Sequence, residues 1–377
     1  MVKRLSIKSG SRCVDEPDIC HNRWHPDIKP SIEVEPGDIV EIETRDALDG
    51  QISNRSGIED VSNADLNLVH PLTGPIYVKG AKPGDLLVVE ILDIVSDSFG
   101  FSVVIPGFGF LRDLFPKPYK ARWIIDGGYA VSPEIPNVRI PGDPFFGVMG
   151  VAPSKALLES IRRREEDLRA RGGIVLPPDP RGAVPQREPI ASEGLRTIPP
   201  RENGGNLDVR HFSPGSRVYF PVFVEGALFS IGDAHFTQGD GEVCGTAVEM
   251  RARARLRFYI VREGSKKYNI RSPVFRPSEN SLRRFTWSKT VAITGFGVID
   301  DKNESENTTL SARHALLNAI DLLERVGYTR EQAYVIASVA IDLRISQLVD
   351  VPNFTVTAFL PLDIFLEPPR ELLEIAL

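Results

Sequence analysis

The segment GDAHFTQGDGE, residues 232–242, gathers three acids and a histidine between glycines. If the residues before it form a strand that ends near His235, then Asp233 and His235 lie two residues apart and project from the same face. Asp240 and Glu242 repeat that spacing after the next turn. Imidazole and carboxylate groups that converge in this way can hold a divalent metal ion and a water molecule. A simple turn built from Asp and Gly is the alternative interpretation of the same residues.

Other acids and histidines occupy similar positions along the chain. Asp46 follows a predicted strand directly, Asp208 ends the glycine-bracketed phrase GGNLD, and His70 precedes PLTGP. Side chains on short loops at strand ends are the usual source of metal ligands and catalytic groups. Each of these residues would equally suit a turn or a cap.

Several other chemistries find little support in the sequence. No glycine-rich loop has the Lys-Ser/Thr of a phosphate loop or the G-x-G-x-x-G of a dinucleotide site, and the phrase GFGF at 107–110 predicts a tight corner or a pocket wall. The paired serines and distant lysine of serine amidases are also missing. Cys244 lies in the alternating run EVCGTAVE, which favours a buried packing residue over a nucleophile.

The remaining cysteines bear on metals and on the cellular compartment. Cys13 and Cys20, with histidines nearby, would form a structural zinc site only with an unusual C-x₆-C spacing. Three cysteines in a chain of 377 residues do not predict a disulfide framework and favour a reducing compartment.

Composition indicates an ordinary globular protein. Apolar residues make up 42% of the chain and charged residues 25%, with a formal charge of −6 that argues against a nucleic-acid partner. The basic run RARARLR at 251–257 alternates as on one face of a strand, and we interpret it as a solvated or inter-subunit face. The chain has no leader-like N-terminus and no apolar stretch of about 18 residues, which predicts a cytoplasmic protein with no membrane partner.

Thirty prolines and 31 glycines divide the chain into short segments that read mostly as strands. Strand–turn phrases at 31–44, 82–94 and 213–224 predict a β-sandwich or barrel-like body. Helices are predicted at the surface over 155–173, on a sheet over 311–327, and from a capping box at Thr329, followed by a strand over 354–360. We therefore expect a mainly β protein of the α+β class. We expect a β-rich body over 1–265 and a smaller α+β part over 266–377. The body contains a loop and helix insertion at 153–200, and within this insertion 177–200 is a long loop or flap.

Taken together, these phrases resemble the acetamidase/formamidase family of amide hydrolases, and the resemblance covers most of the chain. The N-terminal phrase HNRWHPD at 21–27 is similar to the formamidase branch, whereas DLRISQ at 342–347 looks more like the acetamidase branch. The phrases that carry the resemblance between them, in order, are EPG at 35–37, Asp46, HPLTGP at 70–75, KGAKPGD at 79–85, PPRENGGNLD at 199–208, VEGA at 224–227, GDAH at 232–235 and QGDGE at 238–242.

The resemblance implies a cytoplasmic homo-oligomer that hydrolyses short aliphatic amides such as formamide and acetamide to carboxylate and ammonia. It also implies a divalent ion, zinc or else calcium, which lowers the pKa of a water molecule that attacks the amide. By this resemblance Asp46, Asp208, Asp233 and His235 lie near the metal. Glu242 or Asp240 is the general base, His235 or Glu242 delivers the proton to ammonia, and Gln238 orients the amide.

His25 and Trp24 either line the substrate pocket or form a buried polar and packing pair, and His70 is expected beside the substrate. Two alternatives stay open at this point. One is an amidase with Cys244 as its nucleophile. The other is a β-sandwich without catalytic activity that uses the acidic loop to bind calcium or another ligand.

Overall fold

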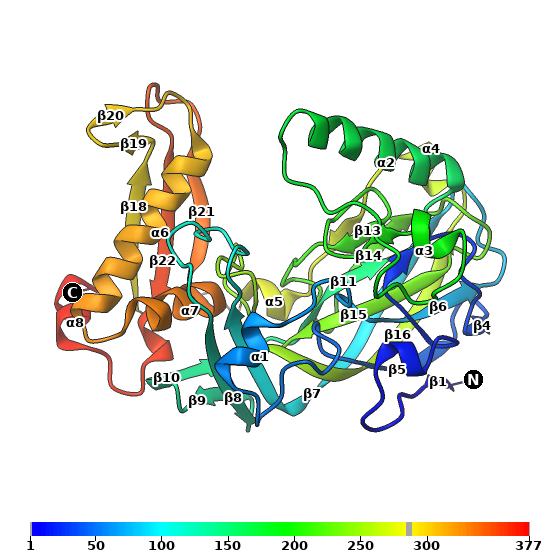
Figure 1. Ribbon diagram of the computed structural model, residues 1–377, viewed down its shortest axis with the longest axis horizontal. Helices are drawn as coiled ribbons and strands as arrows, with labels where there is room; N and C mark the ends of the chain where they lie inside the picture. Colours follow the sequence, from blue (N-terminus) through cyan, green and yellow to red (C-terminus); the bar gives the residue numbers. More distant parts are fainter. Residues whose placement is uncertain (1, 284–288, 377) are drawn as a thin grey trace.

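The computed structural model describes residues 2–283 and 289–376. Its largest element is a twisted 15-stranded sheet, in which the long antiparallel pair β7 (Leu86–Val104) and β16 (Glu249–Val261) lies at the centre (Figure 1). Along β16 Arg251, Arg253 and Arg255 of the RARARLR run are exposed and Arg257 is half-buried, whereas the alanines and leucine between them are buried. This two-residue alternation is expected for a strand with one face on the core.

The strands of this sheet come from residues 2–276 of the chain. From β7 the sheet continues through β8, β9 and β10 on one side and through β16, β15, β11 and β13 on the other, while β5 and β14 add further partners. The remaining strands are β1 (Val2–Leu5), β2 (Cys20–His21), β4 (Ile32–Val34), β5 (Ile39–Thr44), β6 (Leu72–Val78), β8 (Tyr119–Asp126), β9 (Tyr129–Ser132), β10 (Ile135–Pro141), β11 (Phe145–Gly150), β13 (Gly204–Asn206), β14 (Arg217–Pro221), β15 (Phe229–His235) and β17 (Val274–Arg276).

A smaller sheet forms the C-terminal part, which stands apart at the left of Figure 1. It has the order β18 (Thr290–Phe296), β22 (Thr355–Pro361), β21 (Asp342–Gln347) and packs against α6 (Thr308–Arg325). Two short ribbons complete the strands: β3 (Arg23–Trp24) with β12 (Leu195–Arg196), and β19 (Val298–Ile299) with β20 (Lys302–Asn303).

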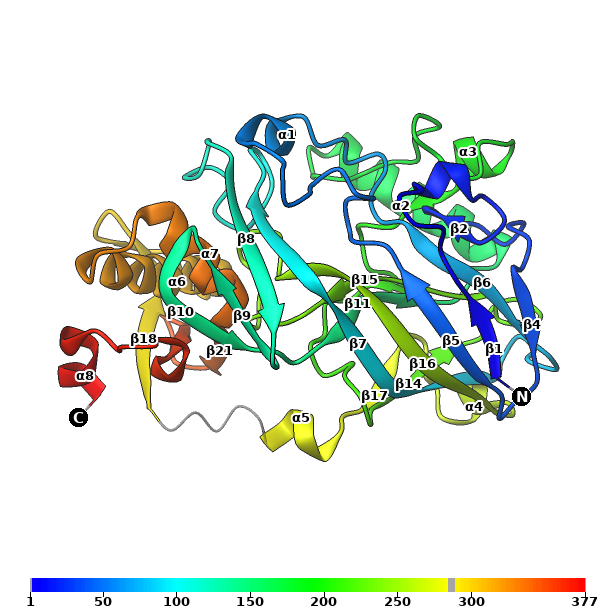
Figure 2. The ribbon, with the colours of Figure 1, turned by 90° about the horizontal axis from the view of Figure 1, so that it is seen from below.

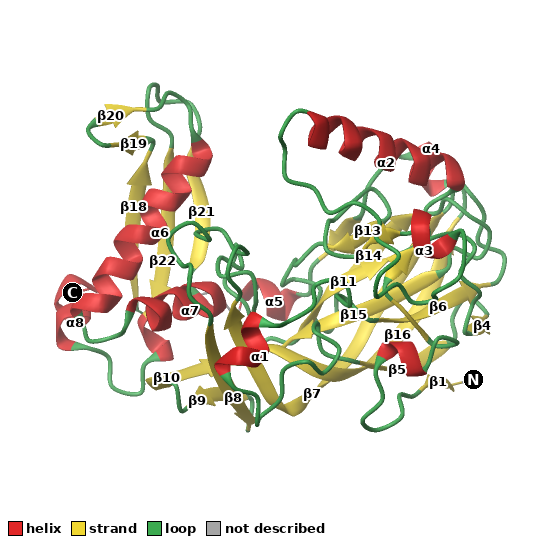
Figure 3. Ribbon diagram, in the orientation of Figure 1, coloured by secondary structure: helices red, strands yellow, loops and turns green. Residues whose placement is uncertain are grey.

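The three predicted helices are present, coloured red in Figure 3. In α2 (Lys155–Ala170) the Ser154 side chain caps the first turn, and only Leu158 and Ile161 are buried, so α2 is a surface helix. In α7 (Arg330–Ala340) Thr329 and Gln332 form the predicted capping box. The other helices are short: α1 (Ile58–Ser62), α3 (Ile190–Glu193), α4 (Gly264–Lys267), α5 (Glu279–Arg283), α8 (Arg370–Ala376), and the 3₁₀ turns η1 (Cys13–Asp15) and η2 (Leu362–Ile364).

The predicted mainly β fold with a smaller C-terminal α+β part is therefore confirmed, and the described strands do not close into a barrel. One hydrophobic core includes residues from both parts of the chain. For example, the Phe115 ring stacks on Tyr334 of α7 with ring centroids 4.1 Å apart. The boundary after residue 265 stays a prediction. No described helix has the length and apolar character that crossing a membrane requires.

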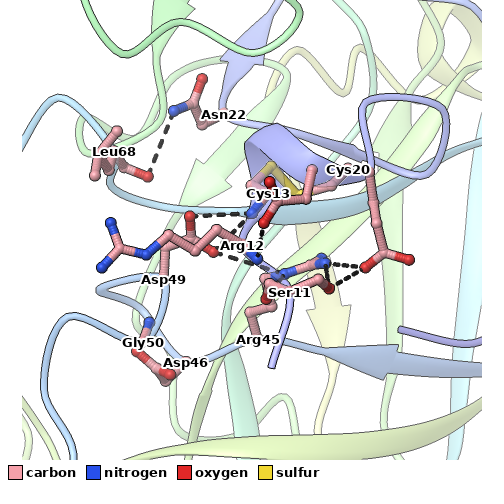
Figure 4. Close-up of polar contacts among 12 residues, drawn as sticks. Ser11, Arg12, Cys13, Cys20, Asn22, Arg45, Asp46, Asp49, Gly50 and Leu68 are labelled. Atoms are coloured by element: carbon pink, nitrogen blue, oxygen red, sulfur yellow. Dashed lines mark hydrogen bonds and ion pairs between the residues drawn. A yellow bond between two sulfur atoms is a disulfide. The ribbon is translucent and has the colours of Figure 1, made fainter. Parts of the chain in front are cut away.

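The cysteine count predicted no disulfide framework, but the structure contains one disulfide. The turn that follows η1 brings Cys13 and Cys20 to a Cα–Cα distance of 5.3 Å, and their sulfurs form a disulfide. This pairing also removes the zinc alternative for these residues, and the cysteine count no longer argues for a reducing compartment. The loop is fixed to the rest of the fold because the Cys13 N–H donates to the buried Asp49 carboxylate at 3.0 Å (Figure 4).

Candidate metal centre and its cavity

The centre of the site is the end of β15, between β11 and β16 in the sheet (Figure 1). Figure 2 shows the same sheet from below, with β7 in front. His235 lies opposite Glu249, the first residue of β16, in the antiparallel ladder. Directly opposed residues have side chains that meet. The His235 Nε2 atom is accordingly 3.1 Å from Glu249 Oε2.

Three further carboxylates approach the same imidazole. Asp233 Oδ1 is 3.2 Å from His235 Nε2, and Glu242 Oε1 is 4.0 Å from it. Asp208, just after β13, joins Asp233 and His235 in one potential metal-binding triad, and Glu242 and Glu249 form a second triad with the same histidine. Within each triad the possible ligand atoms lie within 4.8 Å of one another. We call these five residues the acidic cluster.

The backbone of the acidic cluster is unusual. Asp208, Asp233 and Glu242 all have positive φ angles, of 47°, 58° and 43°. Residues other than glycine rarely adopt this left-handed conformation, and it concentrates at functional sites. Three cluster members are thus held in conformations that a chain would not select for stability alone.

Gly147 of β11 makes room for the cluster. A Cβ atom at this position would lie 2.3 Å from Asp208 Oδ1, 2.5 Å from Asp233 Oδ2 and 3.0 Å from His235 Cε1. Real Cβ atoms are essentially never found closer than 3.0 Å to such neighbours. The missing side chain therefore allows the carboxylates to approach the strand.

Gln238 fixes the orientation of the His235 ring. The Gln238 Nε2 group donates to the Asp208 carbonyl oxygen at 3.0 Å, which turns the Gln238 Oε1 atom toward His235 Nδ1, also at 3.0 Å. Nδ1 must then carry a proton to donate, and the Nε2 atom faces the carboxylates. Metal-binding histidines in proteins commonly have this arrangement, with one ring nitrogen held by a neighbour and the other free for the ion.

Burial and mutual repulsion dominate the electrostatics. Burial, reinforced by Asp233, raises the pKa of Asp208 to about 7, and burial likewise raises the pKa of Glu249 to about 7. Burial together with Asp208 raises the pKa of Glu242 well above its ordinary value. Burial alone would lower the pKa of His235, but Glu249 and Asp233 raise it well above 6.5. The site holds more negative charge than one imidazole can balance.

A cavity of about 560 Å³ opens beside the cluster. Asp208, Asp233, Glu242 and Glu249 line part of it, and His70 lies next to them with Nε2 3.9 Å from Asp233 Oδ2. The buried His70 Nδ1 atom makes no hydrogen bond within the described chain. The phrase 107–110 forms another part of the wall, as one of its two interpretations predicted.

The sequence profile of the Acetamidase/Formamidase family matches residues 6–367. The chain belongs to this family. It is 41% identical over 366 residues to a formamidase of Methylophilus methylotrophus, covering 92% of this chain and 89% of that protein. It is 40% identical over 363 residues to an acetamidase of Mycolicibacterium smegmatis, covering 88% of each. Among solved structures, the gamma lactamase from Delftia acidovorans superimposes with a TM-score of 0.93 at 38% identity, over 98% of this chain and 95% of that one.

Two acids that the resemblance assigned to the site of this acetamidase/formamidase are not members of the acidic cluster. Asp46 accepts hydrogen bonds from the Leu48 and Gly50 N–H groups, both at 3.1 Å, and so stabilises a turn. Asp240 pairs with Arg210 at 3.3 Å. Neither residue belongs to the potential metal-binding groups found in the described chain. The turn interpretation therefore fits Asp46 better than a ligand role.

Trp24, His25 and Gln238 are not among the described residues that line the cavity. The Trp24 ring packs in an apolar cluster with residues such as Leu72 and Leu158, and His25 Nδ1 accepts from the Asp27 N–H at 3.1 Å. Neither Trp24 nor His25 is among the described residues that line the cavity, so both fit the buried-pair interpretation. Gln238 lies behind His235 instead of facing the cavity.

The thiol of Cys244 has no access to the cavity. It is buried, and its Sγ–H group faces the carbonyl oxygens of Val103 and Thr246. Burial raises the pKa of this thiol, which disfavours the thiolate that a nucleophile requires. The geometry thus weighs against a cysteine mechanism.

Glu249 is the cluster member that sequence reasoning missed. The two-residue alternation along β16 predicts that Glu249 lies on the same face as the exposed Arg251 and Arg253. The sequence therefore indicates a solvent-exposed charge. The pairing of β16 with β7 is irregular between Met250 and Ala252, and before this point Glu249 is buried, with only 2% of it exposed. No local signal in the sequence marks this change.

Proposed function

We propose that this protein hydrolyses short aliphatic amides, formamide and acetamide among them, at a divalent metal centre in the acidic cluster. Water adds to the amide carbon, the C–N bond breaks, and the products are the carboxylate and ammonia. The names of the two curated relatives, formamidase and acetamidase, support the reaction class. Their likeness to this chain over most of its length speaks against a binding protein without catalytic activity.

One observation supports the metal ion in this proposal. Asp208 Oδ1, Asp233 Oδ1, His235 Nε2 and Glu249 Oε2 are all buried, and none has a hydrogen bond of acceptable geometry among the described residues, although His235 Nε2 lies 3.2 Å from Asp233 Oδ1 and 3.1 Å from Glu249 Oε2. Polar atoms of this kind are costly to bury, and a cation that binds them removes the cost. The imidazole nitrogen favours zinc over calcium, since calcium takes oxygen ligands. We assign Asp208, Asp233 and His235 as the ligands and zinc as the ion.

A divalent ion at this position supplies Lewis-acid polarisation and lowers the pKa of a bound water molecule toward about 7. The chain's own part is proton transfer and orientation. Glu242 lines the cavity beside the ligand triad, and its raised pKa suits a carboxyl group that accepts the proton of the attacking water and later delivers it to the leaving ammonia. We therefore prefer Glu242 over Asp240 as the general base.

Two neutral groups are available to hold the amide. Burial lowers the pKa of His70, so its imidazole is uncharged at neutral pH, and its Nδ1 atom has no hydrogen-bond partner in the described chain. Asn206 Oδ1 is likewise buried without a described partner in the cavity wall. We propose that Asn206 accepts a hydrogen bond from the amide NH₂ group and that His70 contacts the amide as well.

The test combines elemental analysis with ammonia release. The purified protein should contain about one zinc per chain, and chelation should abolish ammonia release from formamide and acetamide until zinc is restored. His235→Ala should lose both zinc and turnover while keeping its circular dichroism spectrum. His314→Ala is the matched control, because His314 is only half-buried, lies outside the acidic cluster and contacts the Phe296 backbone. Full turnover by the metal-free protein would refute the metal centre.

The cytoplasmic location and the homo-oligomeric state stay predictions. Light scattering during size-exclusion chromatography would measure the second. The proposal requires no partner other than the amide itself.

A further inference from the structure

The cavity beside the acidic cluster has two chemically different walls. One wall carries the four carboxylates and His70. The remainder includes Arg112, Asn206 and Thr246 but is otherwise mostly apolar, and six of its side chains pack together: Leu48, Leu66, Val69, Ile105, Phe108 and Ile198. We call these six residues the apolar wall.

The apolar wall is a separate structure from the main core. Its members belong to a hydrophobic cluster of their own, and they come from the loop after β5, the segment before β6, the loop after β7 and the loop at 198. Leu66, Phe108 and Ile198 remain partly exposed at the cavity. Apolar side chains that stay exposed inside a concave site beside a few convergent polar groups are typical of ligand pockets.

The size of the cavity exceeds what the smallest amides require. Proteins enclose drug-sized ligands in pockets of roughly 300–1,000 Å³, and this cavity measures about 560 Å³. Formamide and acetamide have only a handful of non-hydrogen atoms and would leave the apolar wall in contact with water. A substrate that covers this wall gains the free energy of burying it.

We infer that the apolar wall is an acyl subsite, and that the protein acts more efficiently on primary amides whose acyl chain has four or more carbons than on formamide or acetamide. This inference rests on the amide hydrolysis proposed above and specifies its substrate class.

The position of the polar groups decides which end of the substrate meets the apolar wall. The carbonyl oxygen and the nitrogen of an amide both need polar partners, and the acidic cluster, His70 and Asn206 provide them on one side of the cavity. The acyl carbon chain has no such need. The orientation that satisfies all three parts of the molecule directs the acyl chain at Leu66, Phe108 and Ile198.

The experiment measures kcat/KM for formamide, acetamide, propionamide, butyramide and pentanamide, with ammonia release from the zinc-loaded protein as the assay. Each added methylene should raise kcat/KM about fourfold, the effect of burying one methylene group, until the chain fills the wall. N-propylacetamide serves as a further arm, since it carries the same extra carbons on the nitrogen. Release of propylamine from it should be no faster than release of ammonia from acetamide.

A variant tests the wall itself. Ile198→Trp fills part of the subsite at a partly exposed position, and it should reduce the ratio of pentanamide to acetamide kcat/KM by about tenfold or more. Ile299→Trp makes the same change on the exposed β19–β20 hairpin, where Ile299 is 50% exposed, and should leave that ratio unchanged. Thermal melting of both variants checks that they fold.

The outcomes separate this inference from the proposed function. A flat or falling profile along the series, with formamide and acetamide turned over, would overturn the acyl subsite and leave the amidase intact. A gain with N-propylacetamide instead of pentanamide would place the chain on the nitrogen side and also overturn the inference. No product from any amide would refute the proposed function as well.

Discussion

Replacing Gly147 with alanine is a sharp test of the acidic cluster, because it adds one methyl group where the structure leaves space for none. The new Cβ would lie 2.3 Å from Asp208 Oδ1 and 2.5 Å from Asp233 Oδ2. The backbone at Gly147 is not in the left-handed region, so alanine is conformationally acceptable there. The substitution therefore acts on the position of the carboxylates and not on strand formation.

The expected loss of activity follows from the distances between the new Cβ atom and the carboxylate oxygens. Ordinary contact begins at 3.4 Å, so the Asp208 oxygen must move by about 1.1 Å, the difference between that value and 2.3 Å. A misplacement of about 1 Å at a reacting centre costs roughly 10²-fold in rate. We expect kcat/KM to fall about 100-fold, equivalent to about 2.7 kcal/mol. Crowding of this kind lowers the free energy of unfolding by about 1–3 kcal/mol.

The assay is ammonia release from acetamide, with zinc per chain and Tm measured on the same preparations. Gly57→Ala is the matched control, because Gly57 has an ordinary backbone conformation and no described atom lies within 4 Å of its would-be Cβ. The control should keep its zinc and its kcat/KM. If Gly147→Ala also kept both, the carboxylates would not need the space that this glycine leaves, and the proposed ligand geometry would be wrong.

Three further predictions concern individual groups. Glu242→Gln should lower kcat/KM by about 10²–10⁴-fold, the range for a lost general base, with the zinc content unchanged. Asp240→Asn alters only the partly exposed ion pair with Arg210 and should change kcat/KM by less than about threefold. The reverse ranking would make Asp240 the base. Cys244→Ala should retain kcat/KM at a lower Tm, and a loss of turnover comparable with that of Glu242→Gln would revive the cysteine mechanism. Burial lowers the pKa of His21 to about 4 from 6.5, so its contribution to folding is complete above pH 6.5 and is lost as the pH falls toward 4, by about 1.4 kcal/mol per pH unit. Urea unfolding of wild type and His21→Gln between pH 7 and 4.5 should show this difference in slope, and parallel pH profiles would contradict it.

The parts of the site that are close in sequence were predictable. Asp233 and His235 belong to one strand end, and their spacing alone indicated that they meet, as the 3.2 Å contact bears out. Glu249 could not be found in this way, because its contact with His235 depends on the register of β15 against β16. The role of Asp46 could not be decided from the sequence, since an acid followed by Gly50 suits a turn as well as a ligand.

For the fold too, features set by local sequence were predictable and features set by long-range pairing were not. The helices α2 and α7 were predictable because their caps and apolar stripes are local signals. The order of the strands in the large sheet was not, because β5, β7 and β15 pair with partners far away in the chain. The pairing of Cys13 with Cys20 was missed because counting cysteines says nothing about which backbone positions a turn brings together.

The left-handed backbone at Asp208, Asp233 and Glu242 implies a trade-off between thermal stability and catalytic activity. Such a conformation costs a residue with a side chain on the order of 1–3 kcal/mol, and glycine adopts it freely. Replacing any one of the three with glycine would also relieve the repulsion among buried carboxylates. A screen that selects only for a high Tm would therefore enrich glycine at these positions and yield proteins that are stable but inactive.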